Sequence, residues 1–215
     1  MNFLKKIIPK PIIPLLIFII ILSIFRVIIW GKFGALYILW NIFLAFVPFF
    51  ISLILTIFIS EKKLTNILLL VGIFLWILFI PNAHYIITDL IHIGEVRQVP
   101  DIYDAFLLFS GAIVGLLFGL YSLSHMEQII KNRFSNKISS IAMPIIFLLI
   151  GFGIYIGRFM RFNSWDFFSN HSTIFRSFND IFSNKDNYAG VLIYTLLFAS
   201  FVYVSYKSWK YMKIE

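Results

Sequence analysis

The chain has 215 residues, of which 60% are hydrophobic and only 13% are charged, and its mean hydropathy is +0.93. A soluble domain of this length is about half apolar and about a quarter charged, so one core cannot bury this much apolar surface. The composition therefore excludes an ordinary soluble protein and predicts a polytopic membrane protein. The sequence has no Cys, which excludes disulfides, thiol nucleophiles and cysteine-based metal sites.

Six segments are long and apolar enough to cross a bilayer, which takes about 20 residues each. They are residues 12–30, 34–59, 64–80, 102–123, 138–157 and 189–206. The first follows three lysines, as in a signal peptide, but no small-residue cleavage site comes after it, so we expect a retained span. The sequence thus predicts an all-α fold: one integral membrane domain over residues 1–215, with six transmembrane helices in a bundle.

Six spans place both chain ends on one side of the membrane, and the basic residues indicate which side. The termini and the loops on their side carry 11 of the 18 Lys and Arg residues. The positive-inside rule assigns that side to the cytoplasm. The heavy use of Ile, Phe, Asn and Lys is typical of an AT-rich bacterial genome, so we expect a bacterial cell-membrane protein with cytoplasmic termini. The basic clusters lack interleaved aromatic residues, which excludes nucleic acid as a partner.

Two short amphipathic helices are expected in the long extracytoplasmic loops. The first covers residues 82–93, because Pro81 suits the first position of a new helix. At 100° per residue its polar and apolar side chains fall in separate arcs. A helix of about 20 Å is too short to cross, so it should lie in the interface. The second covers residues 172–183, where Ile and Phe recur at helical spacing.

Tyr85, Asp89 and His92 share one face of the first of these helices. Asp89 and His92 are three residues apart, so the carboxylate can orient the imidazole and raise its basicity. Asp89 and His92 are therefore the candidate catalytic residues, whereas His84 points away and is expected to face solvent. Two other interpretations stay open, a solvated polar face and metal ligation. One Asp and one His make an incomplete metal shell, so no metal or other cofactor is expected.

More polar residues are predicted at the same extracytoplasmic end. Arg158 and Arg161 lie three apart on one helical face, where they can snorkel to lipid headgroups, pair with Asp89 or Asp104, or clamp an anionic group. A buried Asn in the second span should bond to another helix or reach the same chamber. The candidate ligand-binding residues are Asn41, Asn82, Tyr85, Asp89, His92, Asp104, Arg158, Arg161, Asn163 and Asp166.

Glycines also recur at helical spacing in the fourth and fifth spans. Gly111, Gly115 and Gly119 are four residues apart, as are Gly153 and Gly157. Small residues at this spacing form a flat stripe that lets membrane helices approach closely. We therefore expect tight packing along the fourth span.

Four blocks of the sequence follow one another over most of the chain. They are WNIFLAFVPF (40–49), FIPNAHYIITDLIHI (79–93), YDAFLLFSGAIVGLLFG (103–119) and GRFMRFNSWD (157–166). In this order they resemble the bacterial membrane family catalogued as domain of unknown function 1361. The resemblance implies a multi-pass membrane protein and carries no activity with it. It also implies a proline where this chain has His84, which weakens any catalytic role for that residue.

Three functions stay open. The first is binding of an anionic lipid headgroup or small solute in an outward-facing polar chamber, in transport or envelope assembly. The second is a membrane-embedded enzyme acting on a lipid-linked phosphate substrate at the outer leaflet, with His92 as base and the arginines stabilising phosphate charge. The third is a structural network that locks the outer half of the bundle. Membrane lipids are the expected partners, and the sequence indicates no oligomeric state.

Overall fold

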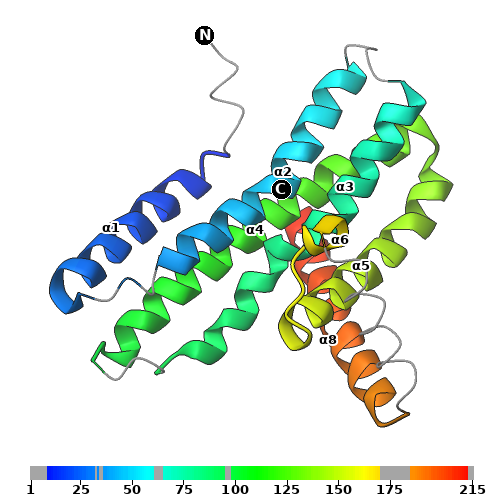
Figure 1. Ribbon diagram of the computed structural model, residues 1–215. Helices are drawn as coiled ribbons and strands as arrows, with labels where there is room; N and C mark the ends of the chain where they lie inside the picture. Colours follow the sequence, from blue (N-terminus) through cyan, green and yellow to red (C-terminus); the bar gives the residue numbers. More distant parts are fainter. Residues whose placement is uncertain are drawn as a thin grey trace.

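The computed structural model describes residues 9–31, 33, 36–60, 65–94, 98–169 and 185–212. These residues form helices and no strands, which confirms the predicted all-α fold (Figure 1). The elements are α1 (Ile12–Trp30), α2 (Leu36–Ser60), α3 (Asn66–Tyr85), the 3₁₀ helix η3 (Ile86–His92), α4 (Asp101–Arg133), α5 (Asn136–Phe159), the short α6 (Asp166–Ser169) and α8 (Lys185–Met212).

Six of the helices in the described residues are long and apolar enough to cross a membrane, which confirms the predicted six-span bundle. Large apolar side chains cover their outer faces, as lipid contact requires; Ile28 of α1, for example, is 74% exposed. The largest difference between a predicted span and the observed helix is at α4. This helix continues past the predicted end at residue 123 to Arg133. Residues 124–133 are polar but include good helix formers, so the helix outlasts its apolar stretch.

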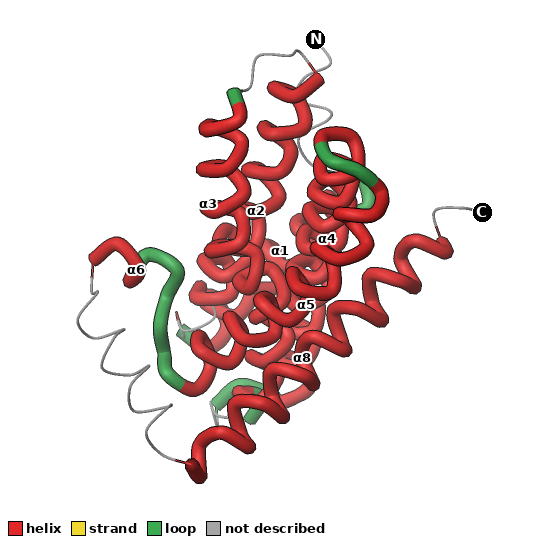
Figure 2. Tube along the Cα trace, turned by 90° about the vertical axis from the view of Figure 1, so that its right-hand side faces the viewer, coloured by secondary structure: helices red, strands yellow, loops and turns green. Residues whose placement is uncertain are grey.

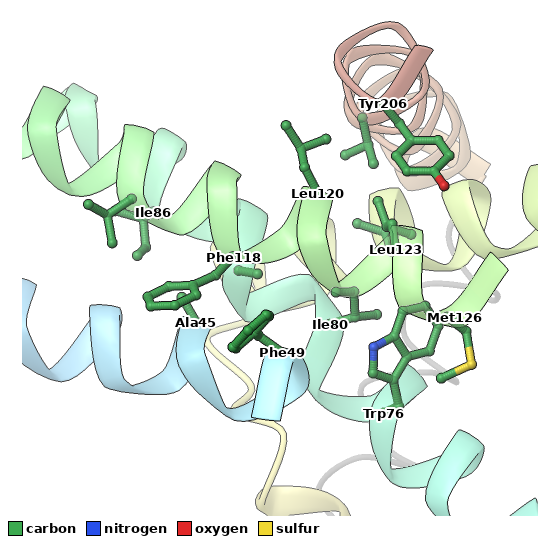
Figure 3. Close-up of a cluster of buried hydrophobic side chains, with 14 of the residues drawn as sticks. Ala45, Phe49, Trp76, Ile80, Ile86, Phe118, Leu120, Leu123, Met126 and Tyr206 are labelled. Carbon is green, nitrogen blue, oxygen red and sulfur yellow. The ribbon is translucent and has the colours of Figure 1, made fainter. Parts of the chain in front are cut away.

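Helix α4 is the centre of the bundle. It packs against α1, α2, α3, η3, α5 and α8, while α2 pairs with α3 and α5 with α8 (Figures 1 and 2). Figure 3 shows part of the core between α2, α3 and α4. In this core the ring centroids of Phe49 and Phe118 are 5.4 Å apart. Trp76 of α3 is fully buried in the same core.

Helix α1 lies at the side of the bundle and packs on α4 (Figure 1). Its buried residues are Ile12, Ile19, Ser23 and Arg26, at spacings of two turns and then one turn each. This narrow stripe faces α4, and most of the remaining surface of α1 faces outward.

The α4 glycines set its distance from α3 and η3. A Cβ added at Gly115 would lie 2.7 Å from the carbonyl oxygen of Ala83, and one at Gly119 would lie 2.5 Å from the ring of His84. At Gly111 it would lie 2.7 Å from a side chain of α2. The prediction that these glycines allow close helix approach is therefore confirmed.

The predicted start of a separate helix at Pro81 is wrong, and no separate interfacial helix is seen at residues 82–93. Helix α3 continues through Pro81 to Tyr85, η3 follows directly, and together they form one membrane-length segment. Pro81 is accommodated because its ring packs against Gly153 of α5, which has no side chain to clash with it. Neighbouring helices commonly stabilise proline inside membrane helices in this way. The second predicted interfacial helix, residues 172–183, lies outside the described residues.

Candidate functional site

A polar cavity of about 1010 Å³ lies at the end of the bundle where α1 and α5 end and where α2 and α4 begin. Side chains from α1, α2, α3, η3, α4, α5 and the segment that follows α5 line it. It brings together all the predicted ligand-binding residues except Asp166. Residues from 26 to 165 in the sequence therefore meet at one place.

Arg158, near the end of α5, donates hydrogen bonds to three other side chains of the cavity. Its Nη1 donates to Asp89 Oδ1 at 3.2 Å and to the Tyr85 hydroxyl at 3.4 Å, and its Nη2 donates to His92 Nε2 at 2.9 Å. The predicted common face of Tyr85, Asp89 and His92 is thus seen, with Arg158 packed on it. The 3₁₀ geometry of η3 strengthens the alignment, because side chains three residues apart are eclipsed in such a helix.

Asp89 has a second partner on its other oxygen. The Asn41 amide of α2 donates to Asp89 Oδ2 at 2.8 Å. The Asp89 side chain is only 4% exposed and that of Arg158 only 12%. A carboxylate at this depth is stable only when it is paired and hydrogen-bonded, so the contacts from α2 and α5 allow a charge in η3. The predicted interhelical role of Asn41 is therefore seen.

The bond from Arg158 occupies His92 Nε2. A guanidinium has only donors, so Nε2 is the acceptor of this bond. The nitrogen that a general base would use is therefore already engaged. Within the described part of the chain, no group of three His, Cys, Asp or Glu side chains is close enough to hold a metal ion. The Arg158 cation beside Asp89 and His92 also disfavours a second cation there.

A second buried ion pair joins α1 to α4. Arg26 Nε donates to Asp104 Oδ1 at 2.8 Å and Arg26 Nη2 to Asp104 Oδ2 at 3.0 Å, with the side chains only 5% and 9% exposed. This bidentate geometry is the strongest form of such a pair. Arg26 is not among the site residues expected from the sequence, so its role was missed. The available signal was an arginine inside a membrane span, which marks a buried partner.

Nearby contacts hold the same end of α1 in place. The Tyr103 hydroxyl donates to the Leu22 carbonyl oxygen at 2.5 Å, and the rings of Tyr103 and Trp30 meet edge to face with centroids 4.9 Å apart. Helix α1 is therefore fixed to the start of α4 beside the cavity.

Arg161 does not share a helical face with Arg158, contrary to the prediction. Helix α5 ends at Phe159, and Arg161 follows it with a backbone φ of 57°. Its side chain is exposed and lines the cavity, and it forms no hydrogen bond or ion pair with any other residue that the structure describes. A residue with a Cβ rarely adopts this left-handed conformation, and such outliers cluster at functional sites.

The segment after α5 is tied back to α3 and to itself. Asn82 Nδ2 donates to Ser164 Oγ at 3.0 Å, and Ser164 Oγ donates to the Leu78 carbonyl oxygen at 2.8 Å. Asp166 Oδ2 accepts from the backbone N–H of Asn163 at 2.7 Å. Asp166 therefore closes a local turn before α6 and does not line the cavity, unlike the other predicted residues.

Two tryptophans mark the rim of the cavity. Trp40 of α2 and Trp165 before α6 lie with ring centroids 6.3 Å apart. Both are substantially exposed. Tryptophan is enriched at the membrane interface, where one edge of the ring is apolar and the other is hydrated.

His84 is buried inside the bundle, so the expectation that it faces solvent is wrong. It is 1% exposed, its Nδ1 lies 3.4 Å from the Ile80 carbonyl oxygen, and its ring packs on Gly119. The helical angle was right, since His84 does point away from the cavity. The environment was wrong because residues 66–92 run through the bundle, so this face meets α4 instead of water.

Six membrane helices in the described residues, five of which line a polar cavity, define a multi-pass α-helical membrane protein. The family model described as protein of unknown function (DUF1361) matches residues 40–202. The chain belongs to this family, which confirms the resemblance noted in the sequence. No curated protein matches the chain, and neither does any solved structure. The matched region begins after α1. Arg26 therefore reaches the cavity from a helix that the family model does not cover.

Proposed function

We propose that the protein binds an anionic group, carried by a lipid headgroup or a small solute, in the cavity around Arg158. The protein would act as a transport or envelope-assembly component of a bacterial cell membrane. The distribution of basic residues supports cytoplasmic termini, with the cavity at the extracytoplasmic surface. The site would then be open to the outer leaflet and to the medium beyond it.

The observation that carries this proposal is an arginine that lines a cavity of ligand size and has no ion-pair partner among the described residues. Three arginines line the cavity together with two aspartates, and the two buried arginines are each bound to one of the aspartates. Arg161 lines the same space without such a partner among the described residues. A guanidinium presents a planar set of donors suited to a carboxylate or phosphate. The volume of about 1010 Å³ is at the upper end of ligand pockets.

The contacts favour binding over the enzyme hypothesis. An Asp-oriented His acting as base needs a free nitrogen that faces the substrate. His92 Nε2 already accepts from Arg158, so it cannot take a proton without losing that bond. The ion pairs also restrain the bundle, as the structural hypothesis requires. They give no reason for Arg161 to line the cavity in a left-handed conformation without an ion-pair partner among the described residues.

Native mass spectrometry in a mild detergent tests the proposal. The protein would be incubated with dioctanoyl phosphatidylglycerol, dioctanoyl phosphatidylcholine or glycerol 3-phosphate, and with Arg161→Gln and Lys137→Gln variants. We expect an adduct with at least one anionic probe, its loss in Arg161→Gln, and its retention in Lys137→Gln. Lys137 is the matched control because it is exposed at the opposite end of the bundle. Equal adducts with the zwitterionic lipid, or none with either anion, would contradict the proposal.

A further inference from the structure

We infer that the cavity is matched to a group with one negative charge, such as a phosphodiester, and discriminates against the doubly charged phosphate monoester. This inference rests on the proposed function and narrows it. It follows from how the charged side chains around the cavity are already paired.

The first arginine is neutralised on the α1 side. Arg26 meets both oxygens of Asp104, at 2.8 and 3.0 Å, and the pair is almost fully buried. A ligand anion that drew Arg26 away would leave the Asp104 carboxylate buried without a counter-charge, which is strongly unfavourable. Arg26 is therefore not available as a second cation for the ligand.

The second arginine is neutralised on the α5 side. Arg158 is bonded to Asp89, His92 and Tyr85, and Asn41 holds the other oxygen of Asp89. Arg158 has five N–H donors, so it can add a hydrogen bond to a ligand while it keeps these partners. It cannot offer a whole positive charge, because Asp89 already balances that charge.

Arg161 supplies the remaining charge. It lines the cavity with an exposed side chain and no ion-pair partner among the described residues. Its φ of 57° indicates that the surrounding chain imposes this position, as is common where a ligand is held. The charged residues lining the cavity therefore leave one positive charge, which compensates one negative charge on a ligand. A second negative charge would enter a largely apolar site without compensation.

The rim favours a lipid as the source of that anion. Trp40 and Trp165 line the cavity together with Arg161, and both rings are substantially exposed, which places them at the edge of the cavity. A phosphodiester between Arg158 and Arg161 would leave glycerol and the first acyl carbons to contact these rings. A soluble ester would gain nothing from them.

Isothermal titration calorimetry of the purified full-length protein in a nonionic detergent tests whether the cavity prefers a ligand with one negative charge. The probes are dioctanoyl phosphatidylglycerol, a phosphodiester, and dioctanoyl phosphatidic acid, a monoester whose second proton leaves at about pH 6. At about pH 5 both probes are mainly singly charged, and we expect similar affinities. At about pH 8 we expect phosphatidic acid to bind about tenfold more weakly than phosphatidylglycerol, or weaker still.

Phosphatidylglycerol also serves as the control for pH-dependent changes in the protonation of the protein itself. Asp89, Asp104, His92 and Tyr85 face the cavity beside the three arginines, and any change in their protonation affects both probes. The ratio of the two affinities at each pH isolates the charge on the ligand. Phosphatidic acid binding as tightly as phosphatidylglycerol, or more tightly, at about pH 8 would overturn the inference.

Asp104→Asn provides a gain-of-binding test. It frees one positive charge, so phosphatidic acid should bind at least as tightly as phosphatidylglycerol at about pH 8. Asp101→Asn is the matched control, because Asp101 is exposed at the same end of α4 and does not line the cavity; it should keep the wild-type ratio. If Asp104→Asn does not fold, Asp89→Asn makes the same charge change at the Arg158–Asp89 pair. The ratio of the two probe affinities in the wild-type protein also tests the inference without any variant.

The remaining outcomes separate the two proposals. If neither the lipids nor the soluble ester glycerophosphoglycerol binds, the proposed function fails; if both lipids bind with the same affinity at both pH values, only the inference about a single negative charge fails. Glycerophosphoglycerol, the same phosphodiester without acyl chains, identifies the source of the anion. Affinity at least about tenfold weaker than for the lipid supports a lipid ligand, and equal affinity supports a soluble ester and overturns the role of the tryptophan rim.

Discussion

Arg26 of α1 and Asp104 of α4 are 78 positions apart in the sequence and form a bidentate, buried ion pair. It joins a helix outside the family-matched region to the central helix of the bundle. Loss of one partner should therefore affect the whole fold.

Arg26→Leu should lower the free energy of unfolding by about 3–5 kcal/mol, because it leaves the Asp104 carboxylate buried without a counter-charge. The double variant Arg26→Leu/Asp104→Leu should recover most of this loss, since two apolar side chains can replace a buried pair at little cost. Thermal denaturation in detergent, combined in a double-mutant cycle, measures both effects. Equal stability of Arg26→Leu and the wild-type protein would show that the pair is solvated in the membrane.

Gly119→Ala should destabilise the protein, because the added Cβ would lie 2.5 Å from the His84 ring. A shift of packed helices of this kind costs about 1–3 kcal/mol. Gly190→Ala is the control, since no described residue outside the adjoining turns of α8 places an atom within 4 Å of a Cβ at Gly190. Removal of a helical glycine there should be neutral or stabilising by up to about 1 kcal/mol. His84→Ala combined with Gly119→Ala should lose less stability than the two single changes added together. An additive result would mean that the ring and the glycine do not pack as described.

Arg161→Gly should be more stable than Arg161→Ala by about 1 kcal/mol, because glycine adopts a φ of 57° without the Cβ clash. Both variants remove the same charge, so they should bind anionic probes equally weakly. Thermal denaturation paired with native mass spectrometry separates the two effects. If Arg161→Ala proves the more stable of the two, the left-handed conformation is not imposed by the fold.

The absence of Cys allows a direct test of orientation. Gln98 and Lys137 are exposed at opposite ends of the bundle, just before α4 and at the start of α5. A membrane-impermeant maleimide added to intact cells should label Gln98→Cys, whereas Lys137→Cys should react only after the cells are permeabilised. The reverse pattern would place the cavity on the cytoplasmic side and contradict the proposed localisation.

The sequence predicted the spans well because membrane length and apolarity are strong, local signals. It also indicated the meeting of Asp89 and Arg158, since opposite charges at the same end of a bundle are expected to pair. Pro81 and His84 were misread because local rules assign proline to helix starts and histidine to solvent. Their neighbours, Gly153 and Gly119, reverse both assignments, and only the packed bundle shows them.

The partner of Asp104 could not be predicted for a similar reason. Asp104 was expected to meet the group around Asp89, but α1 brings Arg26 to it instead. Nothing in the sequence states which helix lies beside α4. The conformation of Arg161 was equally inaccessible, because a single residue beyond a helix end carries no periodic pattern.

The packing of α1 on α4 also constrains the order in which the protein assembles in its membrane. Arg26 is synthesised long before Asp104, and α1 has its buried stripe on α4. Until α4 arrives, α1 must stay in the bilayer as an isolated helix, with Arg26 reaching toward the lipid headgroups. Docking of the first span therefore waits for the fourth, and the ion pair forms only after α4 has entered the membrane.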